Sequence, residues 1–435
     1  MSDLVIRPSR GLRGEIELPG DKSISHRSVM FAAIAEGDTR ITGFLTGADT
    51  MNTAKAVRML GAEVEGIGSQ NLVVHGKGLH GLTEPTCVLD LGNSGTGMRL
   101  LAGLLAGQDF FSVLTGDQYL RKRPMARIVE PLRQMGAGID GRSGGRLAPL
   151  AIRGSRGMRA IDYQSPVASA QVKSALLLAG LFANGATSVS EPSKSRDHTE
   201  RLFRFFGVTV KEEGNRVTVP GLQRLRAPGP LAIPSDISSA AFFMVAASIV
   251  PGSDLLIRNV GVNPTRTGVI DVLSAMGADI VLENGREEAG EPVADIRVRH
   301  VRLRATKISG DVIPRAIDEI PVLCVAASYA EGTTVIRDAA ELRVKESDRI
   351  ATMAAELRKM GVVVTELPDG MEITGQETLT GAVCESHGDH RIAMSTAVAG
   401  LAARGDTSVR DTGWIETSFP GFERLLRKAA YGKDA

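Results

Sequence analysis

The sequence predicts an α/β protein that is built from six copies of one helix–strand–helix–strand–strand repeat and divided into two domains. Three observations support this fold class. An Ala/Leu-rich helical segment recurs six times, a second, amphipathic helical segment lies between successive copies, and a β-branched run follows each helix. The copies are spaced 67 to 80 residues apart, which is too regular for chance and too long for a solenoid repeat.

The first helix of each repeat ends near a glycine that opens a short β-type run, as in MFAAIAEGDTRI and LLLAGLFANGATSV. The six glycines are Gly37, Gly107, Gly185, Gly252, Gly332 and Gly405. The second helix is amphipathic, as in AKAVRMLG and VIDVLSAMG, and its final glycine predicts a left-handed C-cap that leads into a strand. These glycines are Gly61, Gly136, Gly207, Gly277 and Gly361.

The sixth repeat stops early, because the chain ends soon after the helix-like stretch FERLLRKAA. The N-terminus supplies a candidate for the missing strands, since GLRGEIELPGDKS parallels RLRAPGPLAIPSDIS in the middle of the chain. We therefore expect domain I to comprise residues 1–19 and 233–435, with its last repeat completed by the N-terminus. Domain II is expected to comprise residues 20–232, with hinges near residues 18–21 and 232–236.

Composition narrows the function classes. The 435 residues carry a net charge of +1 and are 43% apolar, which is typical of a globular protein with an ample core. No apolar run is long enough to span a bilayer, and MSDLVIRPSRGLRGEIELPG does not resemble a leader peptide. Three scattered cysteines indicate reduced, buried thiols. We expect a cytoplasmic monomer that binds neither membrane nor nucleic acid.

Polar residues gather where each Ala/Leu-rich helix begins. Ser, Asn and Asp there are typical helix caps, and the uncapped N–H groups of a helix start attract anions. Any one of these segments could be a plain cap on a buried helix. The segments are GDKSISHR, GNSGTGMR, SPVASAQVKS, PSDISSA, IDEIP and GDHRIAM. Basic residues in three of them favour an anion site: Lys22, Arg27, Lys173 and Arg391.

A second set of loops follows the β-runs and carries closely spaced cations. Each could be a solvated face with local ion pairs, as KESDR would allow. The repeat symmetry favours a site instead, because equivalent loops of two facing domains would meet at one cleft. The cations are Arg121, Lys122, Arg123, Lys194, Arg196, Arg343, Lys345 and Arg349.

A ligand for these loops should be small and multiply anionic, because Arg binds carboxylate and phosphate in bidentate fashion. The sequence has no Walker loop, no dinucleotide-binding glycine motif after a strand and no metal-spaced Cys/His cluster. His387, Asp389 and His390 are better explained by a cap and a local hydrogen bond than by a metal. We expect neither metal nor cofactor.

Eight motifs in order resemble the 5-enolpyruvylshikimate-3-phosphate synthase family of the shikimate pathway, from about Pro19 to Pro420. They are PGDKSISHR, LGNSGTGMRL, RKRPM, ASAQVKSALLLAG, RDHTE, IDE, LRVKESDR and DHRIAM. The resemblance implies the two-domain, pseudo-sixfold enolpyruvyl transferase fold, an inside-out α/β barrel with three βαβαββ units in each domain. It also implies transfer of the enolpyruvyl group of phosphoenolpyruvate to the 5-hydroxyl of shikimate 3-phosphate, with release of phosphate and without a cofactor.

The same resemblance implies roles for individual residues. Those expected to bind shikimate 3-phosphate are Lys22, Ser23, Arg27, Ser169, Ala170, Gln171, Arg196, Asp318 and Lys345. Those expected to bind phosphoenolpyruvate are Lys22, Asn93, Gly95, Arg123, Gln171, Arg349 and Arg391. The expected catalytic residues are Asp318, Glu346 and Lys22, which would move protons during formation and collapse of a tetrahedral intermediate. Glu346 beside Lys345 and Asp348 beside Arg349 could equally be ion pairs.

Two departures from the family pattern concern the site. Many members carry a Lys before the terminal Phe-Pro, where this chain has Glu416 and Thr417, and some have Ser-Ser-Gln where this chain has Ser169, Ala170 and Gln171. With RDHTE, these traits resemble the branch that is often less sensitive to glyphosate.

Two alternatives are open at this stage. UDP-N-acetylglucosamine enolpyruvyl transferase shares the fold but uses a Cys in the loop where residues 114–127 contain none. A pseudo-sixfold ring could also clamp nucleic acid without chemistry, which would require basic surface on every repeat.

Overall fold

The computed structural model describes residues 3–432 and divides into two compact units. The first unit comprises Met1–Pro19, Pro234–Glu287 and Pro292–Ala435, of which residues 1–2 and 433–435 lie outside the described residues. The second unit comprises Gly20–Ile233 and Glu288–Glu291. Residues 233 and 288–291, which the repeat pattern assigns to domain I, thus group with the second unit.

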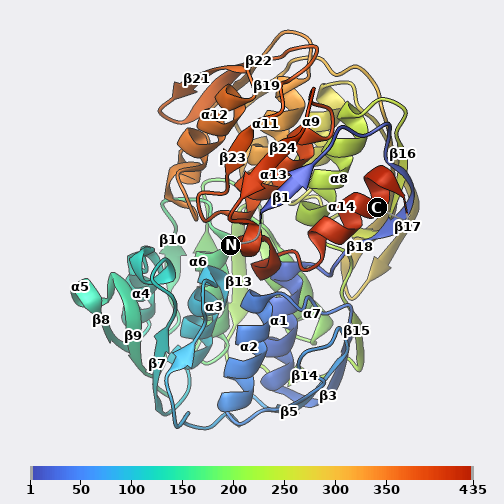
Figure 1. Cartoon of the computed structure of the whole chain (residues 1–435). Coiled ribbons are helices and arrows are strands. Elements are labelled where there is room, and N and C mark those ends of the chain that lie inside the picture. Colours follow the sequence, from blue (N-terminus) through green and yellow to red (C-terminus); the bar gives the residue numbers. More distant parts are fainter. Residues whose placement is uncertain (1–2, 433–435) are drawn as a thin grey trace. The chain divides into compact units, whose positions relative to one another are not determined.

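Each unit contains three small sheets in the part of the chain that the structure describes (Figure 1). The strands of the first unit are β1 (Leu4–Ile6), β2 (Arg13–Glu17), β16 (Asp254–Gly261), β17 (Asp279–Glu288), β18 (Glu291–Arg299), β19 (Lys307–Ile308), β20 (Thr333–Ile336), β21 (Val363–Leu367), β22 (Gly370–Thr374), β23 (Val383–Glu385) and β24 (Thr407–Arg410). They form the sheets β17-β18-β16-β2, β19-β20-β22-β21 and β1-β24-β23.

The second unit repeats this arrangement. Its strands are β3 (Ala35–Thr42), β4 (Glu63–Glu65), β5 (Leu72–Lys77), β6 (Leu89–Asp90), β7 (Phe111–Thr115), β8 (Gly138–Gly141), β9 (Leu147–Arg153), β10 (Asp162–Gln164), β11 (Ala186–Ser190), β12 (Lys211–Glu213), β13 (Arg216–Pro220), β14 (Leu225–Arg226) and β15 (Pro230–Ala232). They form the sheets β14-β3-β5-β4, with β15 also paired to β3, then β6-β7-β9-β8 and β10-β11-β13-β12.

Every sheet combines parallel and antiparallel pairs, as a βαβαββ repeat requires. In the third repeat, β10 and β11 are parallel, and β13 pairs antiparallel with both β11 and β12. A parallel pair needs a crossover connection, and in four repeats the first helix lies in it, between β6 and β7, β10 and β11, β19 and β20, and β23 and β24. In the other two repeats the parallel partners, β2 with β16 and β15 with β3, are far apart in the sequence. The six-repeat α/β prediction is confirmed.

The first helices of the repeats form the core of each unit. They are α1 (Lys22–Ala33), α3 (Gly95–Ala106) and α6 (Ala170–Gly180) in the second unit, and α8 (Ile237–Ile249), α11 (Ile320–Ser328) and α13 (His390–Gly400) in the first. All residues of α8 and α11 are buried, because Ala, Ser and Val leave every face able to pack. Close approach of α3 to α6 requires Gly103, whose added Cβ would lie 2.2 Å from the Ala175 carbonyl oxygen.

The second helices lie on the outside of this core and are amphipathic. They are α2 (Ala48–Met59), α4 (Ala126–Gln134), α7 (His198–Phe205), α9 (Gly268–Ala275), α12 (Arg349–Lys359) and α14 (Phe422–Tyr431). The predicted C-cap glycines have left-handed φ angles: Gly61 87°, Gly136 104°, Gly207 81°, Gly277 85° and Gly361 90°. These angles confirm the five predictions. Glycine is used at these positions because a residue with a Cβ is strained in the left-handed region.

Short elements occupy the connections. The remaining helical segments are α5 (Arg142–Gly145), α10 (Val312–Ala316), η1 (Leu120–Lys122), η2 (Ala340–Val344) and η3 (Thr412–Thr417). Three of them, η1, η2 and η3, lie in loops that follow a β-run, between the two helices of a repeat. These loops are the ones in which the sequence places most of its closely spaced cations.

The N-terminal segment is shared between two sheets, so the prediction that it completes the last repeat is only partly correct. Strand β1 does so, pairing antiparallel with β24. Strand β2 instead pairs parallel with β16 in the fourth repeat, and β15 pairs in the same way with β3 in the first. Each of these strands precedes a helix of the other unit, so the chain crosses between the units twice.

The described residues include three free cysteines. Cys324 and Cys384 are buried, and burial raises the pKa of both thiols, the latter to about 12. Cys87 is exposed, contrary to expectation, because it lies in the irregular segment before β6. None of the helices between residues 3 and 432 is long and apolar enough to cross a membrane.

Candidate active site

Five of the six core helices begin with a side-chain cap, so the polar residues at these starts do act as helix caps. The accepting side chains are Asp21 (from Ile24 N, 2.8 Å), Ser94 (from Gly97 N, 3.0 Å), Ser169 (from Val172 N, 3.5 Å), Asp236 (from Ser238 N, 2.8 Å) and Asp389 (from Arg391 N, 2.8 Å). Capping explains why these residue types recur. It leaves the charged residues beside the caps to be explained.

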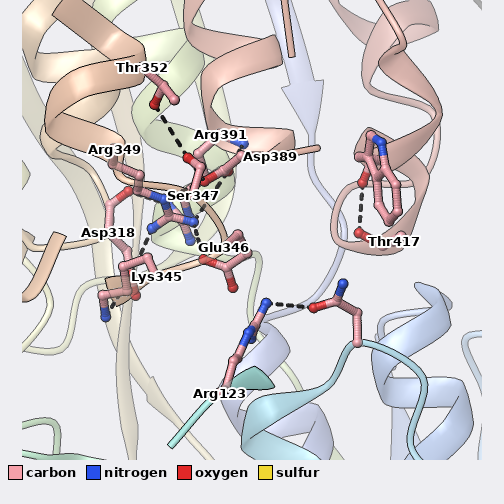
Figure 2. A network of polar contacts seen from close by, with 12 residues as sticks. Arg123, Asp318, Lys345, Glu346, Ser347, Arg349, Thr352, Asp389, Arg391 and Thr417 are labelled. Atoms are coloured by element: carbon pink, nitrogen blue, oxygen red, sulfur yellow. Dashed lines mark hydrogen bonds and ion pairs between the residues drawn. The ribbon is translucent and has the colours of Figure 1, made fainter. Parts of the chain in front are cut away.

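Arg349 is the centre of the polar cluster in the first unit (Figure 2). Its side chain is only 1% exposed and donates to three carboxylates. Nε lies 2.8 Å from Asp389 Oδ2, Nη2 lies 2.6 Å from Glu346 Oε2, and Nη1 lies 3.4 Å from Asp318 Oδ1. Burial would lower the pKa of Arg349, but Asp389 and Glu346 outweigh it and raise the pKa. The guanidinium therefore stays charged and fixes both expected catalytic carboxylates.

The two expected catalytic carboxylates keep partial access to solvent. The side chains of Asp318 and Glu346 are 18% and 24% exposed. Lys345 Nζ lies 3.6 Å from Asp318 Oδ1, so Lys345 pairs with Asp318, and Glu346 pairs with Arg349. Asp348 caps α12 and pairs with Arg343 at 2.7 Å. The sequence suggested the ion pairs Glu346–Lys345 and Asp348–Arg349. Both carboxylates are in ion pairs, but Glu346 pairs with Arg349 and Asp348 pairs with Arg343.

Arg391 lies at the start of α13 and reaches the residues after α10. Its Nη1 donates to the Asp318 carbonyl oxygen at 2.6 Å and lies 3.5 Å from Glu319 Oε1. Glu319 is fully buried and also accepts from the Ser238 hydroxyl, which Arg266 contacts at 2.6 Å. These bonds tie α8, α11 and α13 together at one end of the core helices. Glu319 lies in the IDE motif but is given no role from the sequence, and Arg266 is not singled out.

In the second unit, Arg27 is a buried arginine that joins several helices by hydrogen bonds. It is 3% exposed, and its Nε and Nη2 donate to Thr199 Oγ1 at 2.7 Å and Ser174 Oγ at 2.8 Å. A further bond runs from Nη1 to the carbonyl oxygen of Ser23 at 2.9 Å. Burial lowers the pKa of Arg27 to about 10, which still leaves it charged at neutral pH. Arg27 thus joins α1, α6 and α7 and positions the start of α1, where Lys22 and Ser23 lie.

Lys22 forms an ion pair with Asp49, the second residue of α2. Asp49 is buried, whereas Lys22 keeps 25% of its side chain exposed, so the ammonium is oriented without being enclosed. The next turn of α1 carries His26, whose Nδ1 lies 2.8 Å from Thr53 Oγ1. Burial and the charges of Lys22 and Arg27 lower the pKa of His26 well below its usual range, so this ring is neutral.

Two of the residues expected to bind phosphoenolpyruvate, Asn93 and Arg123, are hydrogen-bonded to each other in the second unit. Arg123 Nη2 donates to Asn93 Oδ1 at 2.5 Å, a contact drawn in Figure 2, and Asn93 Nδ2 donates to Asp117 at 2.9 Å. A Cβ added to Gly95 would lie 3.2 Å from Arg123 Nη1 and 2.8 Å from Arg99 Nη1. The absence of a side chain at position 95 is what lets both guanidinium groups approach this helix start.

Gln171 is held by two bonds. Its Oε1 accepts from Arg99 Nη1 at 2.7 Å, and its Nε2 donates to Thr96 Oγ1 at 2.9 Å. Arg99 is 5% exposed and also donates to the Pro124 carbonyl oxygen at 3.0 Å. Arg99 thus connects the starts of α3 and α6 with the loop that carries Arg123.

Ser169 and Ala170 lie at the start of α6, and Arg196 lies in the loop between β11 and α7. Ser169 N donates to Glu191 Oε1 at 2.7 Å. Lys173, which the sequence favoured as an anion contact, is instead 1% exposed and pairs with Glu191 and Glu200 at 3.1 and 2.7 Å. Lys194 also forms a local ion pair, with Glu212 at 2.8 Å. Lys173 and Lys194 are therefore paired within the protein. The expected role of Arg196, binding of shikimate 3-phosphate, stays a prediction.

Two histidine-containing groups bear on the question of a metal. Of the three residues weighed in the sequence, His387 lies 2.6 Å from Glu356 and Asp389 binds Arg349, so these two have separate partners. Among the described residues, ligand atoms of Glu63, Glu65 and His75 lie within 4.8 Å of one another. His75 is already bonded to Asp38 and Glu65, and we assign no metal there.

The place where many family members have a Lys is occupied by η3. Thr417 Oγ1 donates to the Trp414 carbonyl oxygen at 2.6 Å, as Figure 2 shows, and Glu416 accepts from Gly421 N at 3.3 Å. Both side chains serve the local turn. The cations of the site come from other segments.

The six repeats and the cationic groups at the helix starts of both units define a protein with the enolpyruvyl transferase fold. A family model described as EPSP synthase (3-phosphoshikimate 1-carboxyvinyltransferase) matches residues 6–426. The chain belongs to this family.

Known proteins agree over nearly the whole length. A 3-phosphoshikimate 1-carboxyvinyltransferase of Citrifermentans bemidjiense is 62% identical over 426 residues, covering 98% of this chain and 99% of the relative. One from Geobacter sulfurreducens is 60% identical over 430 residues, covering 99% and 100%. The solved EPSP synthase of Acinetobacter baumannii has a TM-score of 0.89 and 49% identity, covering 98% of both chains. These matches do not favour the sugar-nucleotide transferase or the nucleic-acid clamp.

Proposed function

We propose that this protein transfers the enolpyruvyl group of phosphoenolpyruvate to the 5-hydroxyl of shikimate 3-phosphate and releases phosphate, a step of the shikimate pathway to chorismate and the aromatic amino acids. The observation that carries the proposal is the family match over residues 6–426. The chemistry of the helix starts supports it, because both substrates are multiply anionic and both units offer oriented Arg and Lys side chains.

The residues proposed for each substrate are those that the motif resemblance implies. Shikimate 3-phosphate is assigned to Lys22, Ser23, Arg27, Ser169, Ala170, Gln171 and Arg196 of the second unit and to Asp318 and Lys345 of the first. Phosphoenolpyruvate is assigned to Lys22, Asn93, Gly95, Arg123 and Gln171 of the second unit and to Arg349 and Arg391 of the first. Arg27 and Arg349 are so deeply buried that they also act by orienting their neighbours.

The reaction needs proton transfers at the 5-hydroxyl and at C3, and Asp318 and Glu346 can share them. Asp318 accepts the 5-hydroxyl proton as the oxygen adds to C2 of phosphoenolpyruvate, and Glu346 delivers a proton to C3, with Lys22 assisting. The resulting tetrahedral intermediate breaks its C2–O bond to phosphate, which leaves with the proton that Asp318 had accepted, and Glu346 takes a proton back from C3 to restore the double bond. The partial exposure of both carboxylates, beside the fixed charge of Arg349, supports this division of tasks.

The first experiment measures phosphate release by the purified protein with phosphoenolpyruvate and shikimate 3-phosphate, without added metal. UDP-N-acetylglucosamine serves as the control acceptor. We expect release with the shikimate ester alone. Release only with the sugar nucleotide would move the protein to the sister enzyme, and release with neither would refute the proposal.

The carboxylate roles are tested by Asp318→Asn and Glu346→Gln, which remove the charge but keep the shape. Each is expected to lower kcat by about 10² to 10⁴ fold, the usual contribution of a positioned acid or base. Glu366→Gln, which alters an exposed ion pair with Arg358, is the control and should keep full kcat. Wild-type kcat in either site variant would remove that residue from the chemistry.

Two further expectations concern the state of the protein rather than its reaction. We expect it to be a monomer and to act in the cytoplasm. Sedimentation velocity with and without both substrates tests the first, and a dimer at enzyme-assay concentration would contradict it. Fractionation of the source cells tests the second.

A further inference from the structure

One buried carboxylate in the second unit contacts the segments that carry Ser169 and Arg196, two residues that the motif resemblance assigns to the phosphate of shikimate 3-phosphate. Glu191 follows β11, and its side chain is 2% exposed. Its Oε1 accepts from the backbone N–H of Ser169 at 2.7 Å. Its Oε2 accepts from the Ser195 hydroxyl at 2.7 Å and from the Ser195 N–H at 3.4 Å. Ser195 directly precedes Arg196, so Glu191 sets the spacing between Ser169 and Arg196.

Lys173 forms a buried ion pair with the Glu191 carboxylate. Its ammonium lies 3.1 Å from Glu191 Oε2 and 2.7 Å from Glu200 Oε1, and it donates to the Ser195 carbonyl oxygen at 3.4 Å. Burial alone would lower the pKa of Lys173, but Glu200 and Glu191 outweigh it and raise the pKa, so the ammonium is charged. Three segments, the start of α6, the loop 191–197 and α7, are joined at this one ammonium.

The buried charges of Lys173, Glu191 and Glu200 are better explained by a role in positioning the surrounding segments than by a contribution to the stability of the fold. A buried ion pair contributes little net stability, because desolvation offsets much of the attraction, but it holds its members in one geometry. An unneutralised carboxylate next to a phosphate site would also repel the ligand, whose phosphate carries about −1.5 to −2 charges at neutral pH. Lys173, whose charge is shared with Glu200, reduces that repulsion while the two oxygens of Glu191 still accept from Ser169 and Ser195.

We infer that Glu191, held by Lys173, is a positioning residue that sets the phosphate-binding geometry of the acceptor site and with it the preference for a phosphorylated acceptor. The inference rests on the proposed function and adds residues that the motif resemblance did not assign. Glu191 does not touch the reacting atoms in this scheme. It acts through Ser169 and Arg196.

The test is Glu191→Gln, assayed with shikimate 3-phosphate and with unphosphorylated shikimate. The variant keeps the Lys173–Glu200 pair, so no buried charge is left alone, and we expect the same urea midpoint as the wild type. The NH₂ group of the new Gln side chain takes the place of one accepting oxygen of Glu191. It cannot accept a hydrogen bond, so the bond to either Ser169 or Ser195 is lost. We expect KM and Kd for shikimate 3-phosphate to rise about 10- to 100-fold, as for supporting residues around other ligands, with little change in kcat or in KM for phosphoenolpyruvate.

The specificity ratio separates positioning from general damage. The kcat/KM for shikimate should not change, so the preference for the phosphorylated acceptor should fall by the same 10- to 100-fold. Glu212→Gln is the matched control, because Glu212 lies in the same unit and pairs with Lys194 of the same loop. It should leave both acceptors unaffected. Ser195→Ala, which removes only the hydroxyl bond to Glu191, should change KM in the same direction by a smaller factor.

Equal losses with both acceptors, or wild-type KM and Kd in Glu191→Gln, would overturn the inference. If Glu191→Gln does not fold, Ser195→Ala decides, and a wild-type specificity ratio in that variant would overturn it. Failure of the proposed function would look different. It would appear in the wild-type protein itself as neither binding nor turnover of shikimate 3-phosphate, and it would overturn the inference as well.

Discussion

Individual residues of the candidate site are fixed by partners that lie far away in the sequence. Arg349 is held by Asp389, 40 residues later, and Gln171 by Arg99, 72 residues earlier. A side chain that is ordered before the substrate arrives loses less conformational freedom on binding, which preserves affinity. The cationic side chains are therefore best understood together with the acidic or amide groups that orient them.

Gly95→Ala is the sharpest test at the scale of single residues. The added methyl would lie 2.8 Å from Arg99 Nη1 and 3.2 Å from Arg123 Nη1, so at least one guanidinium must shift. We expect KM for phosphoenolpyruvate to rise and inhibition by glyphosate to weaken, with kcat largely retained. Steady-state kinetics with both compounds measures this. An unchanged inhibition constant would remove Gly95 from the phosphoenolpyruvate pocket.

At the scale of elements, the helices could be predicted from local sequence signals. The pairing of strands into sheets depends on contacts between distant segments and could be predicted only in part. The cap residues and the terminal glycines act within one helical turn, so Ser94 and Gly136 could be recognised in the sequence. The partner of β2 could not, because RGEIE has no pattern that distinguishes pairing with β16 from pairing with β24. Motifs at helix starts and in the loops after the β-runs indicated the candidate site residues, whose roles stay predictions. The buried Glu191 that orients Ser169 carried no motif.

The β-bulge in β16 gives a pH-dependent prediction at this scale. Asn259 has a left-handed φ of 58°, and Asp295 on β18 accepts from its N–H at 2.8 Å and from Arg258 Nη1 at 2.8 Å. Burial would raise the pKa of Asp295, but these donors and the Asn284 amide lower it to about 2. A lowered pKa stabilises the fold at pH values above the unfolded-state pKa near 3.8, and this contribution is lost as the pH falls through 2.

We therefore expect Asp295→Asn to lower the free energy of unfolding at pH 7 by about 2 kcal/mol, the equivalent of the pKa difference. The gap to the wild type should persist down to about pH 5 and narrow between about pH 4 and 2. Urea unfolding across this range measures it. Glu287→Gln, an exposed change on β17, should show no gap at any pH. A gap for Asp295→Asn that did not depend on pH would show that charge is not the cause.

At the scale of the whole molecule, the two chain crossings divide the residues of the candidate site unevenly. The second unit is almost one continuous segment with all three of its sheets complete, whereas the first needs β1 and β2 from the N-terminus. The proposed proton-transfer carboxylates Asp318 and Glu346 belong to the first unit, and Ser169 and Arg196 belong to the second. Acceptor binding and chemistry should therefore be separable by cutting the chain.

The segment 20–233, produced alone, is expected to fold cooperatively and to bind shikimate 3-phosphate without turnover. It retains its own hydrophobic core and all the strands of its three sheets, but it lacks Asp318 and Glu346. It also lacks Glu291, which lies 2.7 Å from buried His198, so its stability should be lower than that of a version extended by a short linker to residues 288–291. Circular dichroism and calorimetry with shikimate 3-phosphate measure both properties. A folded segment with no affinity for the ester would mean that its phosphate is bound chiefly by the first unit, and would contradict the roles given to Ser169 and Arg196.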